Sequence, residues 1–194
     1  MNTIVTEMTD RGEVAVDVYQ KLSEDRILFV CGALSDQLAT DIVATLLLKD
    51  AEDPTKKITL FLNSPGGDIR NAFMICDMMN IVEAPIETVC IGAAMNEAAL
   101  ILSSGEPGQR FATKNAVVGI SQLHHDYFSV GDLTDAKKLF QLSATDNKKM
   151  IDLLAKSTKK TAKQITNDVE RQVFLTAPQA AKYGLIDKVV TLSK

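Results

Sequence analysis

The chain has 194 residues, which suits one domain with a substantial hydrophobic core. Its net charge of −4 gives no broad basic surface for nucleic acid or an anionic membrane, although lysines cluster within residues 148–163. No apolar run approaches membrane-spanning length, and the polar start lacks the apolar stretch of a secretory leader. We therefore expect neither nucleic acid nor a membrane among its partners.

The first half of the chain alternates short apolar runs with helical patterns. Residues 28–30 read as a buried strand, and Ser35 is a good cap for the helix that follows. A second strand is expected at residues 58–62, ending in a Pro-Gly-Gly turn, and a third at residues 86–91. Between them, apolar residues recur at helical spacing (Ile69, Phe73, Met78 and Ile81). This β-α-β-α order predicts an α/β fold with a mainly parallel sheet.

The second half contains a strand at residues 117–120 and a long amphipathic helix over residues 133–156. A capping box at residues 176–179 predicts another helix start, and Gly184 a helix stop. No linker, repeat or low-complexity segment divides the sequence.

The cysteines and histidines give no metal-binding pattern. Cys31, Cys76 and Cys90 lie in apolar runs without metal-ligand spacing, so we expect buried, reduced thiols. Two adjacent histidines, His124 and His125, are too few for a histidine-rich metal site. The sequence predicts no metal, no cofactor, and a reducing compartment, either the cytoplasm or the stroma or matrix of a bacterially derived organelle.

Two glycine-containing or small-residue turns follow predicted strands and should lie at the same edge of the sheet. Residues 90–100 read as a strand, a tight turn and the start of a helix, where a hydrolase would place a nucleophilic serine. The turn holds Asn96 instead. The second turn, residues 63–67, has the sequence Asn-Ser-Pro-Gly-Gly, whose backbone amides could bind an oxyanion.

The chain resembles the ClpP family, the proteolytic ring subunits of ATP-dependent Clp proteases. The resemblance rests on landmarks that occur in the family's order (residues 10–13, 63–67, 90–92, 105–110, 174–178 and 183–187). It implies the ClpP/crotonase-like fold, with a long handle helix and strand added to the repeated β-α units. It also implies two stacked seven-membered rings, and a single domain over residues 1–194. Within that domain we expect an axial segment (1–18), a head (19–122 and 161–194) and a handle region (123–160).

The resemblance places the family's serine, histidine and aspartate at Asn96, Ser121 and Gln172. None of these side chains can act as the corresponding triad member, because Asn has no nucleophilic hydroxyl, Ser is not a base, and neutral Gln cannot stabilise an imidazolium. The oxyanion-hole positions are Gly67 and Glu97, whose carboxylate would add negative charge there.

Other family positions carry over in the same way. The substrate-cleft loop falls at Ser64, Pro65 and Gly66, and a subunit contact at Glu170 and Arg171. The pockets that dock an AAA+ unfoldase fall at positions with fewer aromatic residues than in the family (Thr59, Phe61, Ile81 and Val190).

Each substituted triad position also has a structural interpretation. Asn96 stands at a predicted helix start, where Asn is among the best N-caps. Ser121 could make a local hydrogen bond at a strand end, and Gln172 could bond to Asn96 or Ser121 in a neutral network. The segment 124–128 is bulkier than the glycine-rich stretch of the family and suggests an altered handle strand or a partner contact.

Three functions follow. The favoured hypothesis is a catalytically inactive ring component that acts as a scaffold, a regulator or the partner of an active ClpP paralogue. The second is an ATP-dependent serine-type endopeptidase with a relocated catalytic set drawn from nearby hydroxyls and ionisable groups (Ser64, Ser103, Ser104, His124, His125 and Asp126). The third is an acyl-CoA enzyme of the related crotonase fold with Glu97 as its base, which the ClpP-like termini disfavour.

Overall fold

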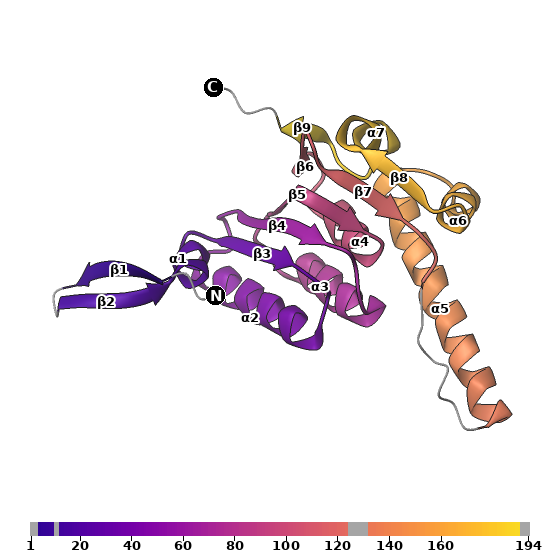
Figure 1. Cartoon of the computed structure of the whole chain (residues 1–194), viewed down its shortest axis with the longest axis horizontal. Coiled ribbons are helices and arrows are strands. Elements are labelled where there is room, and N and C mark those ends of the chain that lie inside the picture. The colour runs from indigo at the N-terminus through magenta and orange to yellow at the C-terminus, as the bar shows by residue number, and fades with distance from the viewer. Residues whose placement is uncertain (1–3, 10–11, 124–131, 191–194) are drawn as a thin grey trace.

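In the computed structural model, which describes residues 4–9, 12–123 and 132–190, a seven-stranded mixed sheet forms the centre of the molecule (Figure 1). Five strands run parallel in the order β3-β4-β5-β6-β9. Their bounds are Ile27–Cys31, Ile58–Ser64, Ile86–Met95, Arg110–Thr113 and Lys188–Val190. The parallel sheet predicted from the alternating pattern is therefore present.

Strand β5 is long enough to pair with two neighbours on the same side. Its residues 88–90 pair with β6, and its residues 93–95 pair with β7 (Val117–Ile120). Strand β8 (Val173–Thr176) then pairs antiparallel with β7. The carboxyl ends of β5 and β7 thereby come together at one corner of the sheet.

The helices bury the apolar face of this sheet. Ile58, Leu60 and Leu62 alternate along β4 and are fully buried, as expected for side chains on the same side of a strand. They join one continuous core with residues of α2, α3 and α4. The helices in chain order are α1 (Val18–Glu24), α2 (Asp36–Glu52), α3 (Ile69–Ile81), α4 (Glu97–Ser103), α6 (Ala162–Glu170) and α7 (Ala177–Tyr183).

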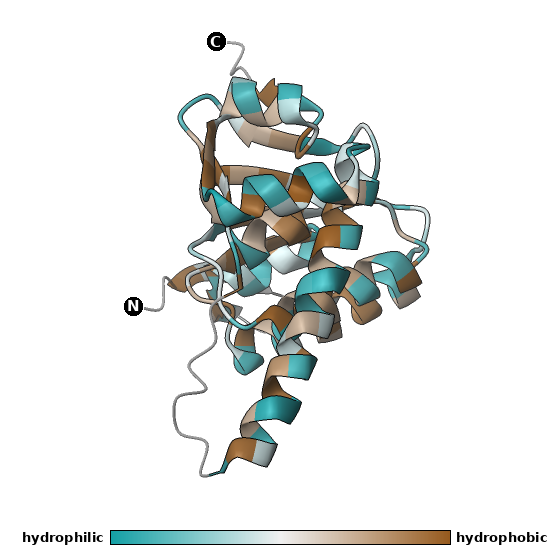
Figure 2. Ribbon diagram, turned by 90° about the vertical axis from the view of Figure 1, so that its right-hand side faces the viewer, coloured by the Kyte–Doolittle hydropathy of each residue, from teal (hydrophilic) through white to brown (hydrophobic). Residues whose placement is uncertain are grey.

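Two elements project from this body. The antiparallel hairpin of β1 (Ile4–Thr9) and β2 (Gly12–Asp17) extends at one end, and α5 (Leu133–Thr158) extends at the other (Figure 1). Apolar and polar stretches alternate along α5 (Figure 2). Its second half is buried against the body, whereas Phe140 in its first half is 76% exposed.

Most elements predicted from the sequence are confirmed. Ser35 caps α2 through a hydrogen bond from the Leu38 amide, and Gln179 Oε1 accepts a hydrogen bond from the Thr176 amide at the start of α7. Gly184 ends α7 with φ 102°, a conformation that favours glycine. The hairpin, α1 and β6 were not predicted.

One prediction about the cysteines is wrong. Cys76 and Cys90 are buried, but Cys31 is exposed, because it is the last residue of β3 and lies on the side of the strand away from the buried residues. The segment 124–128, with both histidines, lies outside the described residues. No helix in the described ranges combines the length and the apolarity needed to cross a membrane.

Candidate active site

Asn96 connects β5 to α4 in a strained backbone conformation. Its dihedral angles are φ 53° and ψ −114°, a region that side-chain-bearing residues rarely adopt. Its amide donates to Gly119 O on the neighbouring strand β7 at 2.7 Å, and its carbonyl accepts from the amide of Ala99 at 3.0 Å. This is the sharp strand-to-helix turn that hydrolases use to present a nucleophile.

The side chain of Asn96 does not cap the helix. Instead its Oδ1 accepts a hydrogen bond from Ser121 Oγ at 2.7 Å, and its Nδ2 donates to Pro65 O at 3.4 Å. The prediction that this side chain serves as an N-cap is therefore wrong. The strained backbone turns it away from the amides of α4 and toward the corner of the sheet.

Ser121 and Gln172 lie just beyond a paired stretch of β7 and β8. Ile120 pairs with Val173, so the antiparallel register places Ser121 and Gln172 at the next facing positions. Ser121 is buried, and its hydroxyl is also 3.2 Å from Gln122 O. Gln172 is exposed at φ 53°, and its side chain makes no hydrogen bond with a residue in the described ranges. The predicted bond from Gln172 to Asn96 or Ser121 is absent there.

The glycine turn, residues 63–67, is fixed by the loop before α2. Gly66 has φ 99°, its carbonyl accepts from the amide of Leu34 at 3.0 Å, and its amide donates to Ser64 Oγ at 3.1 Å. A Cβ added to Gly67 would be 2.6 Å from Leu34 N, so glycine is required for this close approach.

The carboxylate of Glu97 lies against the glycine turn. Its Oε2 accepts a hydrogen bond from the Gly67 amide at 3.1 Å, and the residue is 6% exposed. A Cβ added to Gly66 would collide with this same oxygen. The amide predicted to bind an oxyanion therefore faces an anionic side chain of the chain itself.

A model of the Clp protease family matches residues 10–193. The chain belongs to the Clp protease family. Membership agrees with the mixed α/β fold and its mainly parallel sheet. Members of this family form ring oligomers in general and, where active, are serine peptidases. The match extends from the hairpin to the strand β9, and so includes the whole candidate site.

The hydroxyls considered for a relocated Clp active site are used in structural hydrogen bonds. Ser64 accepts from the Gly66 amide, and both Ser103 and Ser104 donate to Leu100 O, at 3.0 and 2.8 Å. No histidine lies in the described ranges that could activate them. Burial also raises the pKa of Cys76 to about 12 and that of Cys90 to about 11, which keeps both thiols protonated at neutral pH.

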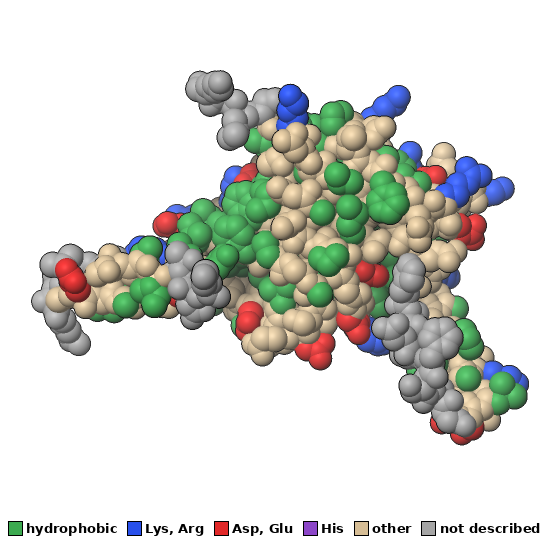
Figure 3. Space-filling model, in the orientation of Figure 1, with side chains coloured by type: hydrophobic (Ala, Val, Ile, Leu, Met, Phe, Trp, Pro, Cys, Tyr) green, Lys and Arg blue, Asp and Glu red, His purple; other side chains and the backbone are tan. Residues whose placement is uncertain are grey.

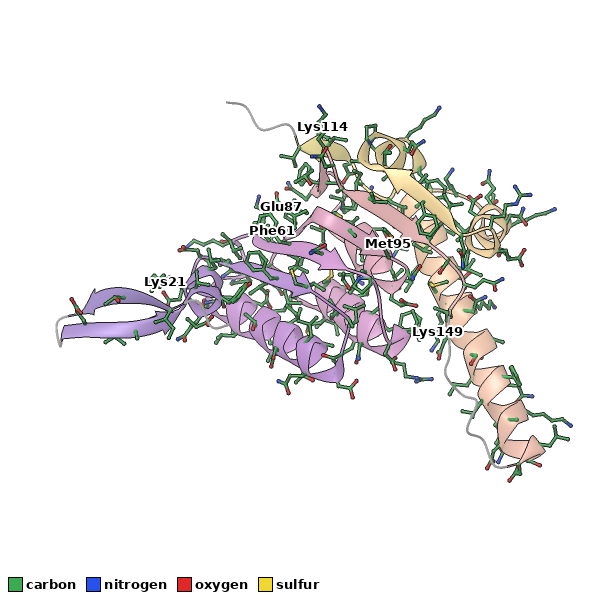
Figure 4. The ribbon with its side chains drawn as sticks, in the orientation of Figure 1. Lys21, Phe61, Glu87, Met95, Lys114 and Lys149 are labelled. Carbon is green, nitrogen blue, oxygen red and sulfur yellow. The ribbon has the colours of Figure 1, made fainter. Side chains whose placement is uncertain are left out.

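One contact beside the site was missed by sequence reasoning. Gly119 on β7 has no room for a side chain, since a Cβ would lie 2.7 Å from Met95 Sδ and 3.0 Å from Phe174 Cδ1. Met95 and Phe174 therefore form an apolar wall next to Asn96, and Figure 4 shows Met95 at the end of β5. The glycine between two apolar strand residues was the available signal.

The predicted docking residues fall in three places on one chain. Thr59 and Phe61 share a face of β4, Ile81 ends α3 and is 67% exposed, and Val190 ends β9. Phe61 stacks on Phe29 with ring centroids 5.5 Å apart.

Apolar side chains gather on the surface over α1, β3 and β4 (Figure 3). An ion pair adjoins them: Glu87 accepts from Thr59 Oγ1 at 3.0 Å and from Lys57 Nζ at 2.6 Å. Figure 4 shows Glu87 next to Phe61. The subunit-contact positions Glu170 and Arg171 are exposed at the end of α6.

Proposed function

We propose that this chain is a catalytically inactive subunit of a Clp-type barrel, acting as a scaffold, a regulator or the partner of an active ClpP paralogue. The observation that carries the proposal is the 2.7 Å hydrogen bond from Ser121 to Asn96. It joins two neutral side chains at the positions of the nucleophile and the base. An amide and a hydroxyl cannot supply an activated nucleophile, because neither accepts a proton at neutral pH.

The surroundings of this pair support the same proposal. Gln172 is exposed, and within the described ranges its side chain makes no hydrogen bond to Asn96 or Ser121. Loss of the nucleophile or the base alone removes about 10⁶-fold in kcat from a triad protease. The turn at Asn96 has a strained backbone, although residue 96 itself carries no hydroxyl that could act as a nucleophile.

Ring assembly is supported by the projecting helix α5. The exposed apolar residues of its outer half are costly in water and suit a subunit contact (Leu133, Phe140 and Leu142). We infer a heptameric ring, paired with a second ring through this handle. Glu170 and Arg171, at the end of α6, would contribute to contacts between subunits.

Binding of an AAA+ unfoldase is part of the proposal. Tyr19, Phe29 and Phe61 form an apolar surface on which the unfoldase could dock. The Lys57–Glu87 ion pair makes the adjoining face more polar. We therefore propose weakened docking. A reducing compartment, the cytoplasm or an organelle stroma or matrix, suits the two buried thiols.

The two other hypotheses have less support. A relocated serine peptidase would need a base near Ser64, Ser103 or Ser104, and the described ranges contain no histidine for that role. An acyl-CoA enzyme would use the Gly67 amide to polarise a thioester, but that amide already donates to Glu97, the residue that would be its base.

Activity-based labelling tests the proposal. Rings confirmed by light scattering should remain unlabelled by fluorophosphonate and β-lactone probes, and should not cleave short fluorogenic peptides. An active Clp protease treated in parallel is the positive control. Stoichiometric labelling of one serine, mapped by mass spectrometry and abolished by its alanine variant, would show that the catalytic set has been relocated.

A further inference from the structure

Glu97 presents a carboxylate to the backbone of the glycine turn in the manner of a bound ligand. Its Oε2 lies 3.1 Å from the Gly67 amide, within the usual range of N–H···O hydrogen bonds. The residue is 6% exposed, so water does not compensate its charge fully and the amide stabilises it.

The turn is shaped for this carboxylate. The missing side chain of Gly66 leaves the space that Glu97 Oε2 fills, because a Cβ there would collide with this atom and would lie 3.0 Å from Met95 O. The Gly66 carbonyl accepts a hydrogen bond from the Leu34 amide, and the Gly66 amide donates to Ser64 Oγ. Together these two bonds fix the direction of the next amide. The Gly67 amide is thus preorganised toward the position of the carboxylate.

Apolar side chains lie beside this position. Met95 and Phe174 form an apolar wall over Gly119, and Asn96 connects that wall to the glycine turn. Phe174 is 60% exposed, so the wall is accessible from solvent. An apolar terminal side chain on this wall would place its own carboxylate near the turn.

We propose that the Gly66–Gly67 turn is a carboxylate-binding site, that Glu97 occupies it in cis, and that it accepts the C-terminal carboxylate of a peptide when Glu97 is removed. Glu97 thereby occupies the acceptor position of its own chain. The inference rests on the proposed function in one respect: because the site is catalytically inactive, a bound peptide is not cleaved. The inference adds that Glu97 excludes a peptide by filling the site, and not only by its negative charge.

Peptide binding to assembled rings tests this inference. The probe is a fluorescein-labelled heptapeptide ending in leucine, prepared with a free carboxylate and as its amide, and followed by fluorescence anisotropy. Wild type should bind neither form. Glu97→Ala should bind the free carboxylate at least about tenfold more tightly than the amide, because a charged oxygen accepts a stronger hydrogen bond from the Gly67 amide than a neutral amide oxygen does.

Glu97→Gln is the matched control, because it removes the charge but keeps an oxygen that accepts from the Gly67 amide. It should remain closed like wild type. Equal binding by Glu97→Gln and Glu97→Ala would overturn the proposal, since charge repulsion alone would then have excluded the peptide. Binding of the carboxylate by wild type would overturn it too.

Two features of the experiment distinguish a loss of binding from a failure to fold and from peptide cleavage. Glu97→Ser opens the same space with a smaller loss of polarity, and serves if Glu97→Ala fails to assemble. An assembled open variant that binds both peptides equally, or neither, would contradict the carboxylate site. The assay measures no cleavage, so labelling of wild type by the serine probes would contradict the proposed function without deciding this result.

Discussion

The hydroxyl of Ser121 donates to Oδ1 of Asn96 at 2.7 Å, across 25 residues of sequence, at the corner where β5 and β7 end. Both side chains are neutral, and neither is a base at neutral pH. The backbone around them retains the strained turn at φ 53°.

Restoration of the triad should produce peptidase activity only when all of its residues are substituted together. Asn96→Ser, Ser121→His and Gln172→Asp together with Glu97→Ala should give measurable cleavage of fluorogenic peptides, because the hydroxyl then has a base and the Gly67 amide is available to the oxyanion. Asn96→Ser alone should give almost none. A correctly assembled quadruple variant without activity would show that the turn no longer fits a tetrahedral intermediate.

The Asn96–Ser121 bond should stabilise the fold measurably. A double-mutant cycle with Asn96→Ala and Ser121→Ala should give a coupling of about 1 kcal/mol, as for one buried neutral hydrogen bond. Chemical denaturation at fixed protein concentration measures it. Thr166→Ala, on the separate helix α6, is the control and should show no coupling with Asn96→Ala. A cycle indistinguishable from this control would mean that the bond contributes nothing to stability.

Gly66→Ala should destabilise wild type more than it destabilises a Glu97→Ala background. In wild type the new Cβ meets both an unfavourable φ of 99° and the Glu97 carboxylate. The Glu97→Ala background retains the backbone strain and the close approaches of Met95 O and Asn96 Cβ, but not the contact with the carboxylate. We expect the difference to be about 1 kcal/mol in the free energy of unfolding. Equal effects in the two backgrounds would place the Glu97 side chain away from the turn.

The Arg110–Asp187 pair should make stability depend on acid pH. Hydrogen bonding to Arg110 lowers the pKa of Asp187, and its Oδ1 lies 2.6 Å from Arg110 Nη2. Because the folded-state pKa lies below the unfolded value of about 3.9, the stabilisation is present above that value and is lost as the pH falls through the folded pKa.

Asp187→Asn should therefore cost about 2 kcal/mol at pH 7, and the difference from wild type should shrink below about pH 4. Denaturation midpoints over that range at one protein concentration would measure it. Lys138→Ala, which breaks an exposed i,i+3 pair with Asp135, should have a much smaller effect. A constant difference across the range would show that Asp187 acts through packing and not through its charge.

The predicted fold was largely right because its signals are local. Apolar runs ending in turn residues located β3, β4 and β5, and helical periodicity located α2, α3 and α5. The hairpin of β1 and β2 was missed because residues 4–6 and 12–15 are exposed and show no buried alternation. Cys31 was placed wrongly because an apolar strand does not reveal which side of its last residue meets solvent.

The site was only partly predictable. The identities of Asn96, Ser121 and Gln172 lead to the prediction that the ordinary triad is absent, since side-chain chemistry depends on residue identity. Their partners were not predictable. The positive φ of Asn96 turns its amide toward Ser121 and away from the helix, and the positive φ of Gln172 accompanies its exposure.

The sequence by itself determined the order of strands and helices, the family and the absence of the usual nucleophile, because these depend on residue identity and spacing. Only the tertiary structure decided where the carboxylate of Glu97 lies. Gly67 and Glu97 are 30 residues apart, and their contact depends on two turns converging at one edge of the sheet. Side-chain direction at such a convergence is fixed by long-range packing, which no local pattern encodes.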